Sequence, residues 1–529
     1  MSSNEDLNGD DWKLSTFCGV DSIIVDRSYK KLQSTMRNQQ KFLYFLILIL
    51  PSLGNQIVDS LITKILSTTT APPQRENPTW DPLTWIKDNF LEPPYNPDID
   101  LTTMEIATRH GYPAEAHTVT TEDGYLLTMH RIPCGRIGCH QKGGRGRGQP
   151  VFLQHGLLSS SADWVISGPG KALAYILADA GYDVWLGNAR GNTYSRRHVS
   201  MSNSDSRYWD FSWHEMAVYD IPAEIDYIYD IKAEESYMNY LDDRGSSDDL
   251  LYIGHSMGTT MAFALLSSRP EYNNKIMAAF ALAPVAFMSH VKSPIRFLAP
   301  FSKDIEQSKS NNQNLNIEIP LKYLTSLRIP NWVDIIANRI LNNMSLRILM
   351  IIKFLGANEF MPQNRIVKFL AKYGCELTQV EREICENTLY VLCGFDKSQF
   401  NSTLMPVIFS HTPAGTSTKT LVHYAQEIDE EGNFQWFDYG LQENKRRYGQ
   451  DKPPSYNITE IRTPFSLFYA QNDWLAGPKD VQKVYKHLQQ SSQLFKVPYD
   501  NFNHVDFLWG IDAPKLVYST LVKIMQNYR

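Results

Sequence analysis

Three features are scarce in this 529-residue sequence, and each scarcity argues against a class of protein. Excess positive charge is missing, because 57 acidic residues outnumber 51 basic ones and leave a net charge of −6. Nothing in this balance therefore favours nucleic acid as a partner. None of the six cysteines stands in the C-x-x-C spacing of a zinc site. The apolar run at residues 42–50 is too short to cross a bilayer comfortably as a helix.

The same apolar run has the length of a signal-peptide core, and it follows basic residues and is closed by a proline. Small residues come next, so cleavage is expected before Asn55. The core is preceded by 41 residues, which is unusual for a signal peptide. We therefore expect translation to begin effectively at Met36. An uncleaved signal-anchor that tethers the protein is the alternative.

Three N-x-[ST] sequons begin at Asn343, Asn401 and Asn457. Each sequon alone is close to chance frequency. They are expected to carry glycans only if the chain enters the secretory pathway, where the modification is made.

Short apolar strands alternate with helical segments along much of the chain. Strand patterns cover residues 150–158, 182–187, 250–253, 276–284 and 464–470, after two strands around an Asp-Gly turn within 119–131. Helical patterns cover residues 170–180, 214–230, 259–266 and 478–489. This alternation predicts an α/β fold with a mostly parallel central sheet and helices on both faces. The active site of such a sheet lies at the carboxyl ends of its strands.

The stretch Gly254-His255-Ser256-Met257-Gly258 follows one of these strands and opens a helix. A strand, a tight turn and a helix around G-x-S-x-G predict a nucleophile elbow. Gly254 and Gly258 lack a Cβ and let the strand and the helix approach closely. The strained turn would hold Ser256 Oγ clear of the backbone. His255 is expected to pack beside the elbow, because adjacent residues cannot easily align for proton transfer.

A serine nucleophile needs a base and a carboxylate that orients the base. α/β-Hydrolases place the three in the order Ser, acid, His. Asp473 is the first acid after the strand at 464–470, and His504 lies in a loop before the final helix. Asp480 and Asp506 are rival acids. Asp480 would lie on the following helix and point away, and Asp506 is too near His504 in sequence for the usual long-range pairing.

The oxyanion that forms in acyl transfer needs backbone N–H donors aimed at the developing charge. One donor is expected from Met257, the residue after the nucleophile. The other is expected from Leu157, in the loop after the strand that ends at His155-Gly156. Leu and Met side chains are acceptable at these positions because the backbone atoms act.

The alternation stops after Pro284. Residues 287–425 are apolar, aromatic and helical without clear strands, which favours a helical cap and lid inserted between sheet elements of one domain. The expected organisation is a disordered extension plus signal peptide at 1–54, a linker at 55–93, the first part of an α/β-hydrolase core at 94–286, the cap and lid at 287–425, and the second part of the core at 426–529.

Seven motifs run in one order from about residue 95 to the C-terminus. They are Gly111-Tyr112-Pro113, Thr121-Glu122-Asp123-Gly124-Tyr125, His155-Gly156-Leu157, Asn188-Ala189-Arg190-Gly191-Asn192, the elbow at 254–258, Asn472-Asp473 and Asn503-His504-Val505-Asp506-Phe507. Together they resemble the acid lipase family, the gastric and lysosomal lipases and their insect relatives. The resemblance implies an α/β-hydrolase with a helical cap and mobile lid, and Ser256, Asp473 and His504 as its triad. It also implies Leu157 and Met257 as the oxyanion hole, and no metal or organic cofactor.

The sequence departs from the family pattern at a few positions. Many members carry Gln where Met257 stands, which leaves the backbone donor in place. The family disulfide matches Cys375 and Cys385, with the first spacing one residue longer, and the free cysteine of the family matches Cys393. The segment that begins at Cys134 looks inserted, and we hypothesise a local disulfide between Cys134 and Cys139.

The expected function is hydrolysis of carboxylic ester bonds in neutral lipids, triacylglycerol or cholesteryl ester, through an acyl-enzyme on Ser256. The expected partner is a lipid ester at a lipid–water interface, and neither nucleic acid nor an obligate protein partner is inferred. A carboxylesterase for small or unusual esters and a catalytically silent lipid-binding protein are the alternatives. We expect the secretory pathway as the location, either the lysosome or the extracellular or gut lumen.

Overall fold

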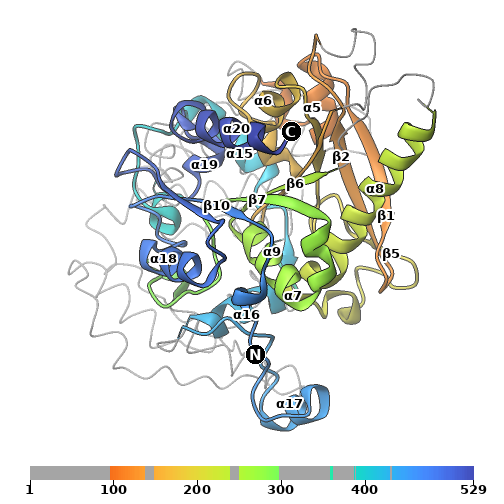
Figure 1. The fold of residues 1–529 in the computed structure, drawn as a ribbon, viewed down its shortest axis with the longest axis vertical. Helices are drawn as coiled ribbons and strands as arrows, with labels where there is room; N and C mark the ends of the chain where they lie inside the picture. The colour runs from red at the N-terminus through yellow and green to blue at the C-terminus, as the bar shows by residue number, and fades with distance from the viewer. Residues whose placement is uncertain are drawn as a thin grey trace, which may run out of the picture. The chain divides into compact units, whose positions relative to one another are not determined.

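A computed structural model describes residues 96–137, 148–238, 249–296, 358–361, 387, 389–428 and 432–529 (Figure 1). The chain divides into two compact units, Met1–Pro93 and Pro94–Arg529, and all described residues belong to the second unit. The predicted signal-peptide core, the linker and much of the predicted cap therefore lie outside the described residues. None of the described helices is long and apolar enough to cross a membrane.

The described part of the chain is built around a nine-stranded sheet. Its strands are β1 (Glu115–Thr120), β2 (Tyr125–Ile132), β3 (Pro150–Gln154), β4 (Asp183–Leu186), β5 (Arg197–His198), β6 (Leu250–His255), β7 (Ile276–Leu282), β10 (Phe465–Tyr469) and β11 (Gln493–Lys496). They lie in the order β1-β2-β4-β3-β6-β7-β10-β11, with β5 paired to β2. The pairs from β4 to β11 are parallel, while β1 with β2, β2 with β4 and β2 with β5 are antiparallel. The predicted mostly parallel sheet is confirmed.

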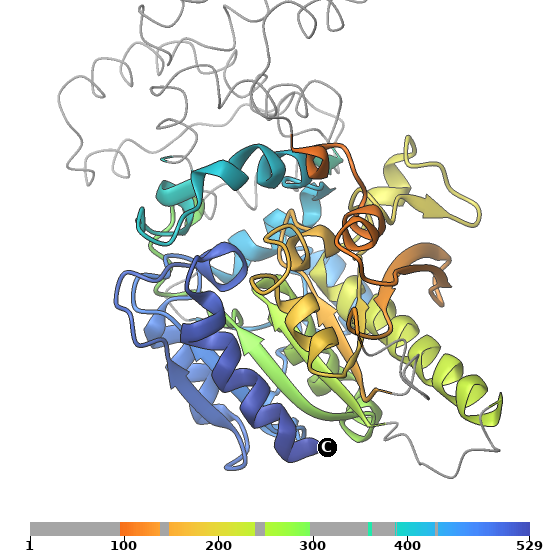
Figure 2. The same cartoon turned by 90° about the horizontal axis from the view of Figure 1, so that it is seen from above.

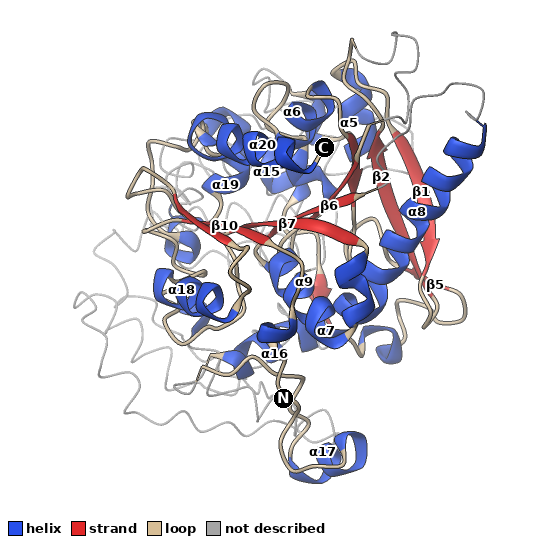
Figure 3. Ribbon diagram, viewed as in Figure 1, coloured by secondary structure: helices blue, strands red, loops and turns tan. Residues whose placement is uncertain are grey.

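Helices cover both faces of the sheet, as predicted. The α-helices among the described residues are α5 (Thr103–Arg109), α6 (Leu173–Asp179), α7 (Trp213–Glu215), α8 (Ile221–Met238), α9 (Met257–Ser268), α15 (Met405–His411), α16 (Thr418–Glu427), α17 (Leu441–Tyr448), α18 (Pro478–His487), α19 (Asp506–Trp509) and α20 (Ser519–Met525). Helices α6 and α20 lie on one face and α9 and α18 on the other (Figures 1 and 3). Figure 2 shows the C-terminal helix from above, beside the sheet, where Tyr528 contacts Phe280 of β7 with ring centroids 6.4 Å apart.

The apolar character of the strands follows from this layering. Every residue of β3 and of β6 is buried, because both strands are central and covered on both faces. Strand β1 lies at the edge and alternates between exposed and more buried positions. Between β1 and β2 the chain turns at Gly124, whose φ of +93° is the conformation expected for the Asp-Gly turn.

The sequence reading missed two strands of the main sheet. Strand β11 has no continuous apolar run, and its residues are exposed or half-buried at the sheet edge, so it lacks the pattern of a buried strand. Strand β5 has two residues and is set only by its pairing with β2. Strands this short carry no periodic signal in the sequence.

The predicted absence of strands from residues 287–425 is wrong in one detail. Two short strands, β8 (Glu359–Phe360) and β9 (Thr416–Ser417), pair antiparallel within this segment. Helix α16 continues past the expected boundary at residue 425 to Glu427. The remaining described elements of the segment are helical, in line with the composition.

Candidate active site

Ser256 stands between the end of β6 and the start of α9. Its backbone has φ 53° and ψ −115°, a conformation that residues with a Cβ rarely adopt. Such strain persists only where the surrounding structure imposes it, and it is concentrated at functional sites. The chain therefore has the strand–turn–helix geometry predicted for the elbow.

Two glycines let β6 and α9 approach each other at this turn. A Cβ built on Gly254 would lie 2.7 Å from the carbonyl carbon of Gly258. A Cβ built on Gly258 would lie 2.3 Å from the backbone oxygen of Gln154 in β3. Both distances are far below a normal van der Waals contact, so the packing admits no larger residue at either position without a shift of the backbone.

The side chains of Ser256, His504 and Asp473 form one hydrogen-bonded chain. His504 Nε2 lies 2.8 Å from Ser256 Oγ. His504 Nδ1 lies 3.0 Å from Asp473 Oδ1 and 2.9 Å from Oδ2. Since a carboxylate only accepts, Nδ1 carries the proton and donates it to Asp473, which leaves Nε2 free to accept from the serine hydroxyl. Residues separated by 248 and 31 positions meet here in the arrangement of a nucleophile, a base and an orienting acid.

The backbone of its own loop also holds the Asp473 carboxylate. This fully buried residue follows β10, and its Oδ1 accepts from the N–H groups of Leu475 at 2.9 Å and Ala476 at 2.7 Å. These donors and the imidazole fix the orientation of the carboxylate before any substrate binds.

The loop after β3 lies against the elbow. A Cβ on Gly156 would lie 3.1 Å from the Cβ of Ser256, so the loop that continues into Leu157 passes close to the serine at Gly156. Met257 is the first residue of α9, and the first N–H groups of a helix have no partner within the helix. Met257 adjoins Ser256 at the start of α9, and the roles of Leu157 and Met257 as oxyanion donors stay predictions.

Comparisons with known proteins agree with this geometry. Residues 103–168 match the family model of the partial alpha/beta-hydrolase lipase region, and residues 149–318 match that of the alpha/beta hydrolase fold. The chain is 37% identical to Lipase lipl-1 of Caenorhabditis elegans over 434 residues, which cover 82% of this chain and 93% of that protein. It is 35% identical to human gastric triacylglycerol lipase over 436 residues and 33% identical to human lysosomal acid lipase/cholesteryl ester hydrolase over 435 residues, with the same coverage in both cases.

The chain belongs to the acid lipase family. Members of this family are carboxylic ester hydrolases. A serine, a histidine and an aspartate in this geometry form the catalytic triad of many such enzymes.

The two rival acids of this acid lipase make other contacts. Asp480 Oδ2 accepts from the backbone N–H of His290 at 2.7 Å, and its Oδ1 lies 2.7 Å from Nδ1 of the same residue. Asp506 Oδ2 accepts from the N–H of Asn503 at 2.7 Å. Burial raises the pKa of Asp506 well above its usual value, with nearby Asp396 and Asp473 acting in the same direction. The carboxylate that bonds the His504 ring is that of Asp473, as predicted from the sequence.

Sequence reasoning missed what His155 does. Its Nδ1 donates to the backbone oxygen of Gly156 at 2.8 Å, and its Nε2 accepts from the N–H of Ala189 at 3.1 Å. Asn192 Nδ2 also lies 3.1 Å from Nε2. Burial lowers the pKa of His155 to about 4, so the ring is neutral near neutral pH and can donate and accept at once. These hydrogen bonds of His155 connect the loop that contains Leu157 to the loop that follows β4.

The cysteines and sequons fall partly within the described residues. Cys134 is in a disulfide bond, but Cys139 lies outside the described residues, so the local pair of the two stays a prediction. Cys393 is free and buried, as the resemblance implied. Asn457 is exposed and Asn401 is half-buried. The other three predicted positions, Cys375, Cys385 and Asn343, lie outside the described residues.

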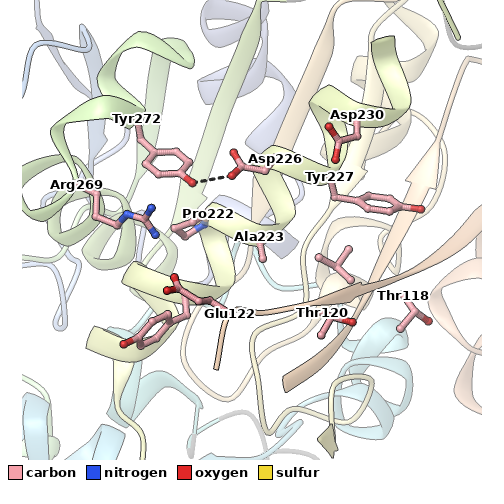
Figure 4. A pocket seen from close by; sticks show the side chains of 12 residues that line it. Thr118, Thr120, Glu122, Pro222, Ala223, Asp226, Tyr227, Asp230, Arg269 and Tyr272 are labelled. Carbon is pink, nitrogen blue, oxygen red and sulfur yellow. Dashed lines mark hydrogen bonds between the residues drawn. The ribbon is translucent and has the colours of Figure 1, made fainter. Parts of the chain in front are cut away.

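A separate groove of about 500 Å³ lies along β1 and α8 (Figure 4). Its lining carries the acidic residues Glu122, Asp226 and Asp230 together with Arg269, and Tyr272 donates to Asp226 at 2.9 Å. None of the triad residues lines it. In the described part of the chain no cluster of three or more His, Cys, Asp or Glu side chains could hold a metal ion.

Proposed function

We propose that this acid lipase hydrolyses carboxylic ester bonds of neutral lipids through an acyl-enzyme on Ser256. The observation that carries the proposal is the hydrogen-bonded chain from Ser256 Oγ through His504 to Asp473, with its distances of 2.8 and 2.9 Å. A hydroxyl, an imidazole and a carboxylate in this order are the apparatus of nucleophilic acyl transfer.

In the first step Ser256 Oγ attacks the ester carbonyl while His504 Nε2 takes the hydroxyl proton. The imidazolium that forms is stabilised by Asp473, which also keeps the ring in the tautomer that accepts at Nε2. His504 then returns the proton to the leaving alcohol, and the acyl group remains on Ser256. Water attacks this ester in the second step, with His504 again as the base.

The N–H groups of Leu157 and Met257 are proposed to stabilise the oxyanion of both tetrahedral intermediates. Such donors lower the barrier by about 2.7–4 kcal/mol each. The N-terminus of α9, a helix of 12 residues, adds a favourable dipole at the same point. Backbone donors of this kind explain why Met is acceptable at position 257.

The substrate class rests on the relatives. One relative is described as a triacylglycerol lipase and another as a cholesteryl ester hydrolase, and this chain covers 93% of each. We propose an ester of a long-chain acid at a lipid–water interface as the substrate, with residues 287–425 as the cap and lid over the site. A mobile cap would expose an apolar surface to the lipid when it opens.

The test is a panel of emulsified triacylglycerol, cholesteryl ester and a soluble short-chain ester, run with wild type and Ser256→Ala. The wild type is expected to cleave an emulsified ester and to take up one organophosphonate label per chain. Ser256→Ala should neither cleave the ester nor take up the label, and it should unfold at the same temperature as the wild type. Turnover that persists in Ser256→Ala refutes the assignment. Activity confined to the soluble ester indicates a carboxylesterase, and an unlabelled wild type indicates a silent lipid-binding protein.

We also propose that the protein enters the secretory pathway and is glycosylated at Asn343, Asn401 and Asn457. The disulfide at Cys134 supports this location, because such bonds persist in oxidising compartments. A mature N-terminus near Asn55 and a mass decrease on enzymatic deglycosylation are the expected results. An intact residue 1 together with an unchanged mass would contradict both statements. A retained apolar run with glycans would indicate the signal-anchor.

A further inference from the structure

A short segment from the middle of the inserted residues lies against both loops that supply His504 and Asp473. Residues 389–393 are helical, and the helix ends at Cys393. The last carbonyls of a helix lack partners within it. Here the backbone oxygen of Cys393 accepts from the N–H of His504 at 3.4 Å and from the N–H of Trp474 at 3.3 Å. One carbonyl thus bridges the base and the residue after the acid.

The next two carbonyls of the segment continue this pairing. The oxygen of Gly394 accepts from Asn503 Nδ2 at 2.9 Å, and the oxygen of Phe395 accepts from Asn472 Nδ2 at 2.9 Å. Asn503 immediately precedes His504, and Asn472 immediately precedes Asp473. We call residues 393–395 the brace, because three consecutive carbonyls each bind a group at or next to a triad residue.

Gly394 is the residue that makes this close approach possible. Its φ is +115°, in the region that side chains disfavour, and a Cβ there would lie 2.1 Å from the backbone oxygen of Asn472. A Cβ would also lie 3.2 Å from the Cβ of Asn503. A side chain at this position must therefore push the acid loop or the histidine loop away.

The brace adds to two other restraints on these loops, the side-chain bond between Asp473 and His504 and the 2.9 Å bond from Asn472 Nδ2 to the Asn501 oxygen. The 2.9 Å bond between Asp473 and His504 joins the side chains only, and each side chain could still move with its backbone. Three backbone carbonyls on a common segment fix the backbones relative to each other. Since a misplacement of about 1 Å costs roughly 10²-fold in rate, this restraint matters for catalysis.

We propose that Gly394 is a positioning residue, and that the Cys393–Phe395 brace sets the distance between the Asp473 loop and the His504 loop. This inference rests on the proposed function, since it concerns the same triad. It also means that a segment inserted between sheet strands, and not only the sheet, determines the geometry of the base.

The test compares Gly394→Ala with the matched control Gly440→Ala. Gly440 also has a positive φ, of +82°, but a Cβ there would meet no atom within 4 Å. For a soluble ester, Gly394→Ala should lower kcat between about 10- and 100-fold with little change in KM, because the loops that hold the base have separated. Gly440→Ala should stay within about twofold of wild type, as expected for an exposed site.

The rate and the extent of organophosphonate labelling separate positioning from folding. Misplacement of His504 slows labelling of Ser256 but lets it reach one label per chain. Partial unfolding instead leaves the rate of the folded fraction unchanged and lowers the extent, and this result overturns the proposal. Labelling of Gly394→Ala at the wild-type rate also overturns it. If the wild-type protein is not labelled by the organophosphonate and does not hydrolyse the ester, the proposed function is wrong, and this inference, which depends on it, is wrong as well.

Asn472→Ala is the second variant, and it decides the matter if Gly394→Ala does not fold. It removes the Nδ2 donor that bonds the Phe395 oxygen and, at 2.9 Å, the oxygen of Asn501 in the histidine loop, without placing an atom in the packed region. Slower labelling with full extent and an unchanged KM is expected, and the effect should be smaller than that of Gly394→Ala because the Cys393 and Gly394 carbonyls keep their partners. A wild-type labelling rate in Asn472→Ala, with folding intact, rejects the brace.

Discussion

The side chain of His255 donates a hydrogen bond to the backbone of His504. His255 Nε2 lies 2.9 Å from the His504 carbonyl oxygen, and the two rings are 5.0 Å apart. A carbonyl only accepts, so His255 carries its proton on Nε2. Burial lowers the pKa of His255 to about 3, and nearby His504 acts in the same direction, so the ring is neutral near neutral pH. The neighbour of the nucleophile thereby holds the backbone of the base.

His255→Phe should lower kcat roughly tenfold, because the ring volume is retained while the His504 carbonyl loses its donor, a loss of about 1–3 kcal/mol for a buried group. KM for a soluble ester should change little. His423→Phe is the matched control: this buried histidine also has its pKa lowered by burial to about 3, but it bonds the backbone oxygen of Gln435. The His423→Phe variant should be less stable than the wild type and have an unchanged kcat. Equal kcat effects in the two variants would contradict a specific role for His255.

Asp473→Asn should leave the fold intact and lower kcat roughly 10⁴-fold, as the loss of an orienting acid does in other triads. The amide oxygen can still accept from Leu475 and Ala476, so the loop keeps its backbone bonds. The amide nitrogen would face His504 Nδ1 and favour the tautomer that carries its proton on Nε2. Steady-state kinetics with a soluble ester, beside thermal unfolding, measure both effects. Near-wild-type turnover would show that another group orients the base.

Gly258→Ala should destabilise the protein by roughly 3 kcal/mol, the upper end of the usual range for overpacked positions. The added Cβ would lie 2.3 Å from the backbone oxygen of Gln154. The contacting atom belongs to the backbone of a central strand and cannot move aside. Gly168→Ala is the control, since a Cβ there meets no atom within 4 Å and only the φ of +77° is strained. Chemical denaturation of both variants gives the comparison, and equal losses would contradict the steric account.

Asp163→Asn should change how stability depends on pH. Burial raises the pKa of Asp163 to about 6, against bonds from Ser159 and Thr412 that lower it. The folded protein therefore binds a proton that the unfolded chain has released between about pH 4 and 6, so this carboxyl group makes stability fall as pH rises through that range. A shift of about two pKa units corresponds to roughly 3 kcal/mol.

The asparagine variant lacks this titration, so its free energy of unfolding relative to wild type should increase from pH 4 to pH 7. Denaturant unfolding at several pH values measures the difference. A constant difference between the two proteins across this range would show that Asp163 ionises at its ordinary pKa in the folded state. Thr412→Val, which removes one bond to the carboxylate, should raise the pKa of Asp163 further and extend the fall in stability to higher pH.

Much of the sheet could be predicted because parallel strands that are buried on both faces consist of consecutive apolar residues. The runs at 250–253 and 276–284 correspond to β6 and β7, which are buried almost throughout. Strand β11 could not be found in this way, because its position at the sheet edge requires no apolar run. Its place is decided by pairing with β10.

The kinds of groups at the site and their order along the chain can be recognised from the amino-acid sequence alone. Ser256 was identified by two glycines that permit a tight turn, and Asp473 and His504 by their places after a strand and before the last helix. These signals are local, since each depends on a few neighbouring residues.

Only the tertiary structure decided what holds these groups in place. The carbonyl of Cys393 meets the N–H of His504 across 111 positions, and the ring of His255 meets the His504 carbonyl across 249. Backbone N–H and C=O groups are the same at every residue, so no pattern of side chains marks which of them will pair. Such contacts are fixed by how the inserted segment packs against the sheet, and that packing appears only when the whole chain is folded.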